Sequence, residues 1–336
     1  MTDSLLDHHD GLLLDLDGTV YRGGDAVSSA AETLAGAREA GVALRFVTNN
    51  ASKSPAQVVD HLRALGLAAE PHEISTSAQA AAAMVAESVP PAAAVLVIGS
   101  AAFADEVAGV GLTPVRRFED EPVAVVQGHS PTTGWADLAE ACLALRFGAL
   151  WIASNGDRTL PTERGELPGN GAMVDALRTA SGREPEFAGK PQVPLLRRAV
   201  ASSGAERPLM VGDRLDTDIA GAVAYGMPSL FVLTGVGTPR DVLTAASEQR
   251  PDRIGADVRA VTEPAAATEI RGSEAWTVRC AESVVELGSS TAQDDADPLA
   301  ALRALCAAWW ATGEGRVDVV GTDATAKSVL YELGLA

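Results

Sequence analysis

The sequence is short of basic residues. It has 26 lysines and arginines against 45 aspartates and glutamates, which gives a formal net charge of −19 at pH 7. Proteins that bind nucleic acid or anionic membrane surfaces need a basic footprint, so this balance argues against both kinds of partner. A phosphorylated ligand would need local compensation from a cation, a lysine or backbone amides.

Cysteine is scarce as well, and no Cys-x-x-Cys pair occurs. An odd number of cysteines cannot pair completely within one chain, so we expect a reduced, cytoplasmic protein. The first ten residues are acidic and lack an apolar core, which argues against a signal peptide. The most apolar region, residues 78–98, is broken by Glu87 and Pro90, so we expect no membrane insertion. The three cysteines are Cys142, Cys280 and Cys306.

What the sequence does have is an alternation of short apolar strands and helices, which occurs in two runs. Strands that alternate with helices at this spacing predict a parallel, doubly wound α/β sheet. Because the first run resumes after the second, the chain is predicted to be one α/β domain that a second α/β unit interrupts. The first run has strands at 12–15, 42–47, 209–211 and 229–233, with helices at 28–40 and 54–65. The inserted run has strands at 95–98, 123–126 and 150–153, with helices at 101–110, 134–147 and 171–181.

Three further regions complete the predicted organisation. Residues 154–170 are rich in glycine, proline and charge, and form a loop long enough to suggest a function. Residues 239–273 are predicted to be irregular and to act as a linker. Residues 274–336 show the order strand, strand, helix, strand, helix, which is a small α+β module. In that module Trp309-Trp310, Leu302, Leu305 and Cys306 have helical spacing and are predicted to be core.

Two carboxylates follow the first apolar strand, in Asp15-Leu16-Asp17-Gly18-Thr19. Ligand sites in open parallel sheets form beyond the carboxyl ends of the strands. Asp15 could attack phosphorus, since carboxylates serve as nucleophiles through an aspartyl-phosphate. Asp17 could protonate the leaving group and then deprotonate water. This division of roles requires a metal near Asp15 and a drier setting for Asp17. The alternative is a solvated Asp-Gly turn.

Two motifs could contact a phosphoryl group. Thr48-Asn49-Asn50 follows the second strand, where a hydroxyl and backbone amides can hold phosphoryl oxygens. Lysine in Gly189-Lys190-Pro191 is a compact charge suited to a carboxylate and phosphate pair. Taken singly, each is more often a turn or a solvated charge.

The last motif, Gly212-Asp213-Arg214-Leu215-Asp216-Thr217-Asp218, follows another strand. Mg²⁺ takes hard oxygen ligands and usually only one or two protein carboxylates. Asp213 at the strand end is the predicted direct ligand. Asp218 is predicted to orient the site or to reach the metal through water, and Asp216 to face solvent.

Together these four motifs, in this order, resemble those of the haloacid dehalogenase-type phosphatases, over roughly residues 10–240. The resemblance implies a Rossmann-like parallel sheet core. It implies that Asp15 is the nucleophile and Asp17 the acid and base. It further implies that Thr48, Asn49, Asn50 and Lys190 bind the phosphoryl group, and that Asp15, the Asp17 carbonyl and Asp213 bind Mg²⁺.

A finer likeness concerns the members with a large cap between the second and third motifs, which include phosphoglycolate, nitrophenyl-phosphate and glycerol 3-phosphate phosphatases. It implies a core of 1–77 and 186–260 and a specificity cap of 78–185. Within the cap, Asn155, Asp157 and Arg158 would line the substrate side.

The C-terminal module resembles part of an acetyltransferase fold, without a clear pyrophosphate loop, and is predicted to be structural or regulatory. With this module, the likeness is greatest to mycobacterial glycerol 3-phosphate phosphatases. Glycerol 3-phosphate is therefore the expected substrate, with phosphoglycolate or a sugar phosphate as alternatives. A phosphotransferase and a decayed phosphate-binding protein are further alternatives, and a homo-oligomer is left open.

Overall fold

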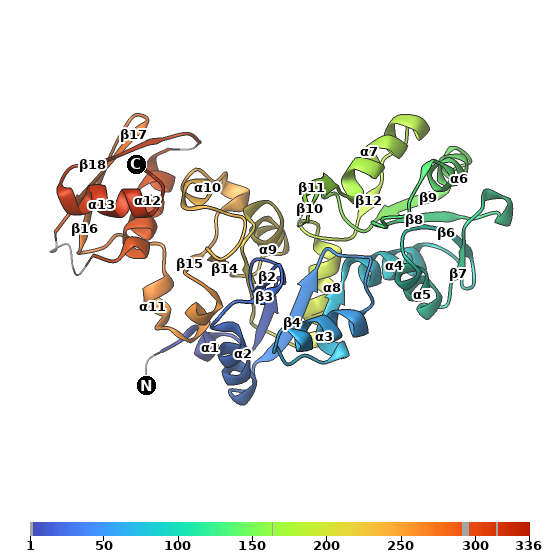
Figure 1. The fold of residues 1–336 in the computed structure, drawn as a ribbon, viewed down its shortest axis with the longest axis horizontal. Coiled ribbons are helices and arrows are strands. Elements are labelled where there is room, and N and C mark those ends of the chain that lie inside the picture. Colours follow the sequence, from blue (N-terminus) through green and yellow to red (C-terminus); the bar gives the residue numbers. More distant parts are fainter. Residues whose placement is uncertain (1–2, 163, 291–295, 314) are drawn as a thin grey trace. The chain divides into compact units, whose positions relative to one another are not determined.

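The computed structural model describes residues 3–162, 164–290, 296–313 and 315–336. The chain forms two compact units (Figure 1). Unit 1 comprises residues 1–44, 65–67 and 203–336, and unit 2 comprises residues 45–64 and 68–202. This division differs from the predicted core and cap, since residues 45–64, 68–77 and 186–202 group with the inserted region. The predicted domain boundaries stay a prediction.

Four parallel strands of unit 1 lie side by side in one sheet. Three of them, β1, β13 and β14, are short apolar runs buried along almost their whole length, which is typical of a parallel sheet covered on both faces. The start of β4 (Ala43–Thr48) lies beside β1, and Ala43 N–H donates to Asp10 O over 2.9 Å. The strand order is β15 (Arg253–Gly255), β14 (Ser229–Val232), β13 (Pro208–Gly212) and β1 (Gly11–Leu14).

Short helices and one hairpin complete this part of unit 1. The predicted helix end at Gly41 is confirmed, because Gly41 has φ +77° and its N–H donates to the carbonyl of Arg38. The prediction that 239–273 is irregular is wrong in part, since this stretch holds β15, two α-helices and two short 3-10 helices. These elements are too short to show a period in the sequence. The helices are α1 (Leu5–His8), α2 (Ala30–Glu39), α9 (Ala220–Tyr225), α10 (Pro239–Leu243) and α11 (Ala265–Thr268), and the hairpin is β2 (Tyr21–Arg22) and β3 (Asp25–Ala26).

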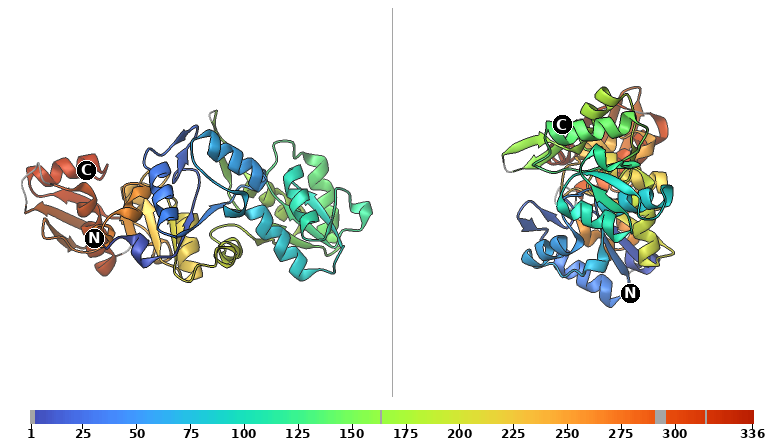
Figure 2. Two further views of the ribbon diagram at one scale, coloured as in Figure 1. Left: turned by 90° about the horizontal axis from the view of Figure 1, so that it is seen from below. Right: turned by 90° about the vertical axis from the view of Figure 1, so that its right-hand side faces the viewer.

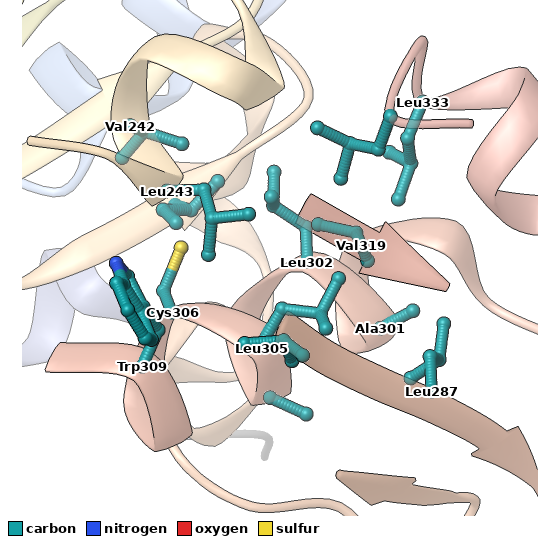
Figure 3. Packing of buried hydrophobic residues seen from close by; sticks show 14 of the residues in the cluster. Val242, Leu243, Leu287, Ala301, Leu302, Leu305, Cys306, Trp309, Val319 and Leu333 are labelled. Carbon is teal, nitrogen blue, oxygen red and sulfur yellow. The ribbon is translucent and has the colours of Figure 1, made fainter. Parts of the chain in front are cut away.

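The C-terminal module has the predicted order of elements and belongs to unit 1. β16 (Trp276–Ala281) pairs antiparallel with β17 (Val284–Ser289), which pairs parallel with β18 (Asp318–Gly321). Helices α12 (Pro298–Thr312) and α13 (Ala324–Glu332) complete it. The predicted core positions are confirmed for Leu302, Leu305, Cys306 and Trp309, which are buried in one apolar cluster (Figure 3). Trp310 is partly buried against the same cluster.

Unit 2 has a five-stranded parallel sheet of its own, which confirms the inserted α/β unit. Its buried strands again alternate with helices, and their apolar residues form a separate core around Leu96, Val125 and Trp151. The remainder of β4 pairs in parallel with β5 (Ile74–Thr76). The sheet order is β12 (Glu186–Phe187), β9 (Leu150–Ala153), β8 (Ala124–Gln127), β6 (Ala94–Ile98) and β7 (Thr113–Val115). The helices are α3 (Pro55–Ala64), α4 (Ser77–Ser88), α5 (Ala101–Gly109), α6 (Trp135–Arg146), α7 (Asn170–Ser181) and α8 (Val193–Ser203).

The predicted loop 154–170 contains regular structure. β10 (Thr159–Thr162) and β11 (Gly165–Pro168) pair antiparallel and project as a hairpin from the rest of unit 2 (Figure 2). Two prolines and the absence of an apolar alternation concealed these strands from the sequence pattern. Within the described ranges, no helix combines the length and apolarity that a bilayer crossing requires.

Candidate active site

Three aspartates of unit 1 meet at the carboxyl ends of neighbouring parallel strands. Asp15 follows β1 and Asp213 follows β13, and these strands pair in parallel. Asp218 lies in one turn of π-helix, Leu215–Ile219, that begins just after β13. One carboxylate oxygen of each aspartate lies within 4.8 Å of those of the other two. The structure therefore brings together the first and last predicted motifs.

This carboxylate cluster suits a divalent cation. Asp213 and Asp218 are 0% exposed, and ionised carboxylates are very costly to bury unless a partner neutralises them. Carboxylates this close also repel one another. Oxygen ligands of this kind are those that Mg²⁺ prefers. The residues thus fit the ion that the sequence predicted.

A loop after β14 holds the Asp213 carboxylate through the backbone. Val236 N–H donates to Asp213 Oδ2 over 2.7 Å, and Gly237 N–H donates to the Asp213 carbonyl over 3.1 Å. The loop comes so close to this carboxylate that a Cβ on Gly235 would lie 2.0 Å from Asp213 Oδ2. Only glycine leaves room for it. Sequence reasoning missed this loop. Its signal was the pair of glycines in Thr234-Gly235-Val236-Gly237, just beyond a buried strand.

The turn that contains Asp17 closes the other side of the cluster. Thr19 Oγ1 donates to Asp213 Oδ1 over 3.4 Å, and Thr234 Oγ1 donates to the Gly18 carbonyl over 2.5 Å. Gly18 has φ +94°, and a Cβ there would lie 2.4 Å from Asp213 Oδ2. Only glycine satisfies both the backbone angle and the close approach.

Asp218 is packed against the backbone that precedes it. Its Oδ2 accepts a hydrogen bond from Arg214 N–H over 3.1 Å, and a Cβ on Gly212 would lie 2.4 Å from the same oxygen. The backbone at the end of β13 therefore fixes the position of the Asp218 carboxylate. That it orients the site or reaches a metal through water stays a prediction. Asp216 is exposed and paired with Arg214 at 2.8 Å, as predicted for a solvent-facing residue.

The drier setting expected for Asp17 is not found. Asp17 is exposed, and its Oδ1 accepts a hydrogen bond from Gly23 N–H over 3.3 Å. Gly23 lies in the turn between β2 and β3. Burial, and then the carboxylates of Asp17 and Asp15, raise the pKa of the Tyr21 phenol. Tyr21 therefore stays neutral beside these acids, a neighbour that the sequence did not indicate.

Lys190 belongs to unit 2 and is 3% exposed. Its Nζ donates to the Val47 carbonyl over 3.0 Å, at the end of β4. The Asn49 carboxamide clamps its backbone, since Asn49 Nδ2 donates to Lys190 O over 2.9 Å and Lys190 N–H donates to Asn49 Oδ1 over 2.8 Å. The structure thus brings the second and third motifs together. The Asn49 side chain is engaged in holding Lys190.

A chain of buried amides continues from Asn49 into the inserted sheet. Asn155 Nδ2 donates to the Asn49 carbonyl over 2.7 Å, and Ser77 Oγ donates to the same carbonyl over 2.6 Å. Asn170, at the start of α7, donates through Nδ2 to the Asn155 carbonyl over 2.7 Å. All three side chains are at most 5% exposed. Asn155, predicted for specificity, is placed as a support for this loop, and sequence reasoning missed Ser77 and Asn170.

The remaining predicted residues of unit 2 have separate surroundings. Thr48 is buried, and its Oγ1 accepts a hydrogen bond from Asn50 N–H over 3.1 Å. Asn50 is exposed, and its carboxamide oxygen accepts hydrogen bonds from the N–H and hydroxyl of Ser52. Asp157 accepts a hydrogen bond at Oδ2 from Asn49 Nδ2 over 3.4 Å. Arg158 forms an ion pair with Asp175 of α7, with 3.4 Å between Arg158 Nε and Asp175 Oδ2.

Comparison with known families gives matches to three parts of the chain. A haloacid dehalogenase-like hydrolase model matches residues 12–113, and a second model of HAD-like hydrolases matches residues 187–261. A model of a GCN5-related N-acetyltransferase-like domain matches residues 273–335.

Comparison with curated proteins gives phosphatases. The chain is 49% identical over 311 residues to the D-glycerol 3-phosphate phosphatase of Mycobacterium tuberculosis. The match covers 91% of this chain and 87% of that protein. It is 38% identical to a 5′-nucleotidase of Bacillus subtilis, over 71% of this chain and 92% of that protein. An acid sugar phosphatase of Staphylococcus epidermidis is 36% identical, over 70% of this chain and 90% of that protein.

Solved structures that are similar to this chain are also those of phosphatases. The glycerol phosphate phosphatase of Mycobacterium tuberculosis in complex with magnesium is 46% identical, with a TM-score of 0.95 over 100% of both chains. A nitrophenyl phosphatase of Thermotoga maritima is 28% identical, with a TM-score of 0.72 over 77% of this chain and 98% of that chain.

Proposed function

Because this chain belongs to the haloacid dehalogenase-like hydrolase family, we propose that it is a magnesium-dependent phosphatase that hydrolyses D-glycerol 3-phosphate to glycerol and phosphate. The observation that supports the phosphatase chemistry is the close approach of Asp15, Asp213 and Asp218 at the strand ends. The choice of substrate rests on the relative that matches over the C-terminal module as well as the core. The nucleotidase and the sugar phosphatase match only about seven tenths of the chain.

Hydrolysis takes place in two displacements at phosphorus. In the first, a carboxylate oxygen of Asp15 bonds to phosphorus while the bond to the glycerol oxygen breaks, and Asp17 gives its proton to that oxygen. In the second, Asp17 takes a proton from water, the water oxygen bonds to phosphorus, and the bond to Asp15 breaks. Inorganic phosphate leaves and both aspartates return to their starting states.

The cation belongs with the acid cluster. Asp15 and Asp213 would hold it with the backbone carbonyl of Asp17, and Asp218 would hold it directly or through water. When bound, Mg²⁺ supplies positive charge that reduces the repulsion between the Asp15 carboxylate and the phosphate dianion. The close contacts of Gly18 and Gly235 with Asp213 keep that carboxylate in place before the ion arrives.

The family motifs assign the phosphoryl oxygens to Thr48, Asn49, Asn50 and Lys190, and we keep this assignment as part of the proposal. The clamp of Asn49 on the Lys190 backbone supports a fixed position for the ammonium group. The roles of Asp157 and Arg158 in substrate choice remain predictions. We also infer a cytoplasmic enzyme, from the three unpaired cysteines of the sequence.

A panel of small phosphate monoesters tests the proposed substrate. Phosphate release is measured for the two enantiomers of glycerol 3-phosphate, phosphoglycolate, glucose 6-phosphate and AMP, each with and without Mg²⁺. We expect the highest kcat/KM for D-glycerol 3-phosphate and no turnover after chelation. A higher value for a sugar phosphate or a nucleotide would reassign the substrate, and phosphate transfer to glucose exceeding release would indicate a phosphotransferase.

Asp15→Asn tests the nucleophile. The amide cannot form the aspartyl-phosphate, so we expect kcat to fall by at least about 10⁴-fold while the unfolding temperature stays within a few degrees of wild type. A matched control is Asp25→Asn, on the exposed β2–β3 hairpin. Retention of activity in the Asp15 variant would contradict the assignment.

A further inference from the structure

The C-terminal module is the largest part of the molecule that the phosphatase chemistry does not use. We propose that it positions the metal site, by fixing helix α10 and, through it, the loop Thr234–Thr238 that holds Asp213. The proposal concerns the protein's side of metal binding and does not depend on which phosphate ester is hydrolysed.

An apolar cluster joins the module to α10. Val242 and Leu243 of α10 are 0% exposed. They belong to the same cluster as residues of α12, and Figure 3 shows Leu243 facing Leu302 and Cys306. This cluster also includes Leu215 and Ile219, the two apolar residues at the ends of the π-helical turn that carries Asp218. The turn that carries Asp218, and the helix that follows the loop holding Asp213, therefore share a core with the module.

Directed hydrogen bonds fix the position of the module on this surface. Trp310 Nε1 donates to the Leu243 carbonyl over 3.1 Å, at the last residue of α10. Arg240, in the same helix, donates through Nη2 to the Leu335 carbonyl over 2.9 Å. Apolar packing alone would permit sliding, whereas hydrogen bonds to named carbonyls set one arrangement.

The N-terminal end of α10 directly follows the loop that holds Asp213. Thr238 is its N-cap, with its side chain accepting from Asp241 N–H. The two residues before it, Val236 and Gly237, donate their N–H groups to Asp213. A helix of five residues is too short to be stable on its own, so its position depends on what it packs against. Here that support includes α12 of the module.

If the module fixes α10 and the loop before it, a variant that weakens the contact between α12 and α10 should loosen that loop. Trp310→Phe keeps an aromatic side chain, with a smaller ring, and removes the hydrogen bond to the Leu243 carbonyl. We expect faster hydrogen exchange in the segment 234–243 of the metal-free protein, by roughly threefold to tenfold, the range expected for losing one hydrogen bond. We also expect weaker Mg²⁺ binding by a similar factor, measured from the Mg²⁺ dependence of the unfolding temperature.

Two further variants complete the experiment, and all are made in the full-length chain. Arg240→Gln removes the hydrogen bond from the guanidinium of α10 to the Leu335 carbonyl of the module. It should also speed hydrogen exchange in 234–243 and weaken Mg²⁺ binding. Tyr331→Phe is the control, since Tyr331 lies on α13 of the module and is 82% exposed. It should match wild type in exchange and in Mg²⁺ binding.

The outcomes separate this proposal from the proposed substrate, because neither readout uses a phosphate ester. Wild-type exchange in 234–243 for both Trp310→Phe and Arg240→Gln would overturn the coupling. So would weaker Mg²⁺ binding with unchanged exchange in that segment, because the effect would then take another route. Loss of both properties in Tyr331→Phe would show general destabilisation and would also overturn it.

Discussion

The acid cluster of unit 1 and the lysine region of unit 2 are built on different principles. Asp213 and Asp218 are held mainly by backbone N–H groups and by glycines whose hydrogen atoms leave room for the carboxylates. Lys190 is held by side-chain amides, chiefly Asn49, which is in turn supported by Asn155 and Ser77. A carboxylate cluster needs donors and space, whereas a buried cation needs an acceptor, which the Lys190 ammonium finds in the Val47 carbonyl. The Asn49 carboxamide has both a donor and an acceptor, so it can bond the carbonyl and the N–H of the Lys190 backbone.

This difference predicts where each region is vulnerable. The acid side should be most sensitive to the addition of a single methyl group, because its contacts are backbone contacts that cannot move away. The lysine side should be most sensitive to the loss of polar atoms, because each amide lost leaves a buried partner without its bond.

The largest effect is expected for Gly235→Ala. The added Cβ would lie 2.0 Å from Asp213 Oδ2 and 2.7 Å from Gly18 Cα, so the carboxylate and its loop must both shift. We expect Mg²⁺ affinity to fall by about 100-fold or more, equivalent to about 2.7 kcal/mol. Isothermal titration of metal-free protein with Mg²⁺ measures it.

Gly36→Ala is the matched control for that variant. Gly36 lies inside helix α2, and an added Cβ would meet nothing within 4 Å. It should leave Mg²⁺ affinity unchanged and stabilise the protein by about 0.5–1 kcal/mol. Equal Mg²⁺ affinities for the two variants would mean that the approach of Gly235 to Asp213 is not what holds the carboxylate.

The next effect is expected for Asn49→Ala. This change removes both hydrogen bonds to the Lys190 backbone, at 2.8 and 2.9 Å. We expect the free energy of unfolding to fall by about 2–4 kcal/mol, because two partly buried groups lose their partner. Urea denaturation measures the loss, and kcat should fall with it. The neighbouring Asn50→Ala is the contrast, because its exposed carboxamide bonds the nearby Ser52. A loss as large for Asn50 would refute the clamp.

The smallest effect is expected for Asn155→Ala. Its Nδ2 donates to the Asn49 carbonyl, but Ser77 Oγ donates to the same oxygen. We expect a loss of about 1 kcal/mol for either single change to alanine, and a larger loss than their sum for the double change, because the carbonyl then has neither donor. Additive losses in a double-mutant cycle would show that the two donors act independently.

Much of this organisation could be predicted from the sequence. The four motifs predicted the family and the phosphatase class, and both are confirmed by the relatives. The magnesium cofactor is confirmed by the related structure solved with that ion. The meeting of Asp15 with Asp213 could be predicted because each directly follows a buried parallel strand, and the carboxyl ends of such strands share one edge of the sheet.

Other features gave little or no local signal. Val236 supports Asp213 with a backbone N–H, which every residue except proline possesses, so its type reveals nothing of the contact. Asn170 and Ser77 resemble ordinary helix-start residues and act through partners more than ten residues away in the chain. The exposure of Asp17 and the pairing of Arg158 with Asp175 likewise depend on how the turn and the loop fold.

Residue order alone was therefore enough to identify the family and the phosphatase class, because three of the four motifs directly follow recognisable strands and all four occur in a characteristic order. It was also enough to predict the module's order of elements and its buried helix. Folding in three dimensions decided which backbone amides and carboxamides hold these side chains, and that α10 packs against α12 of the module. Such contacts join residues remote in the chain, and their geometry follows from packing that no short segment encodes.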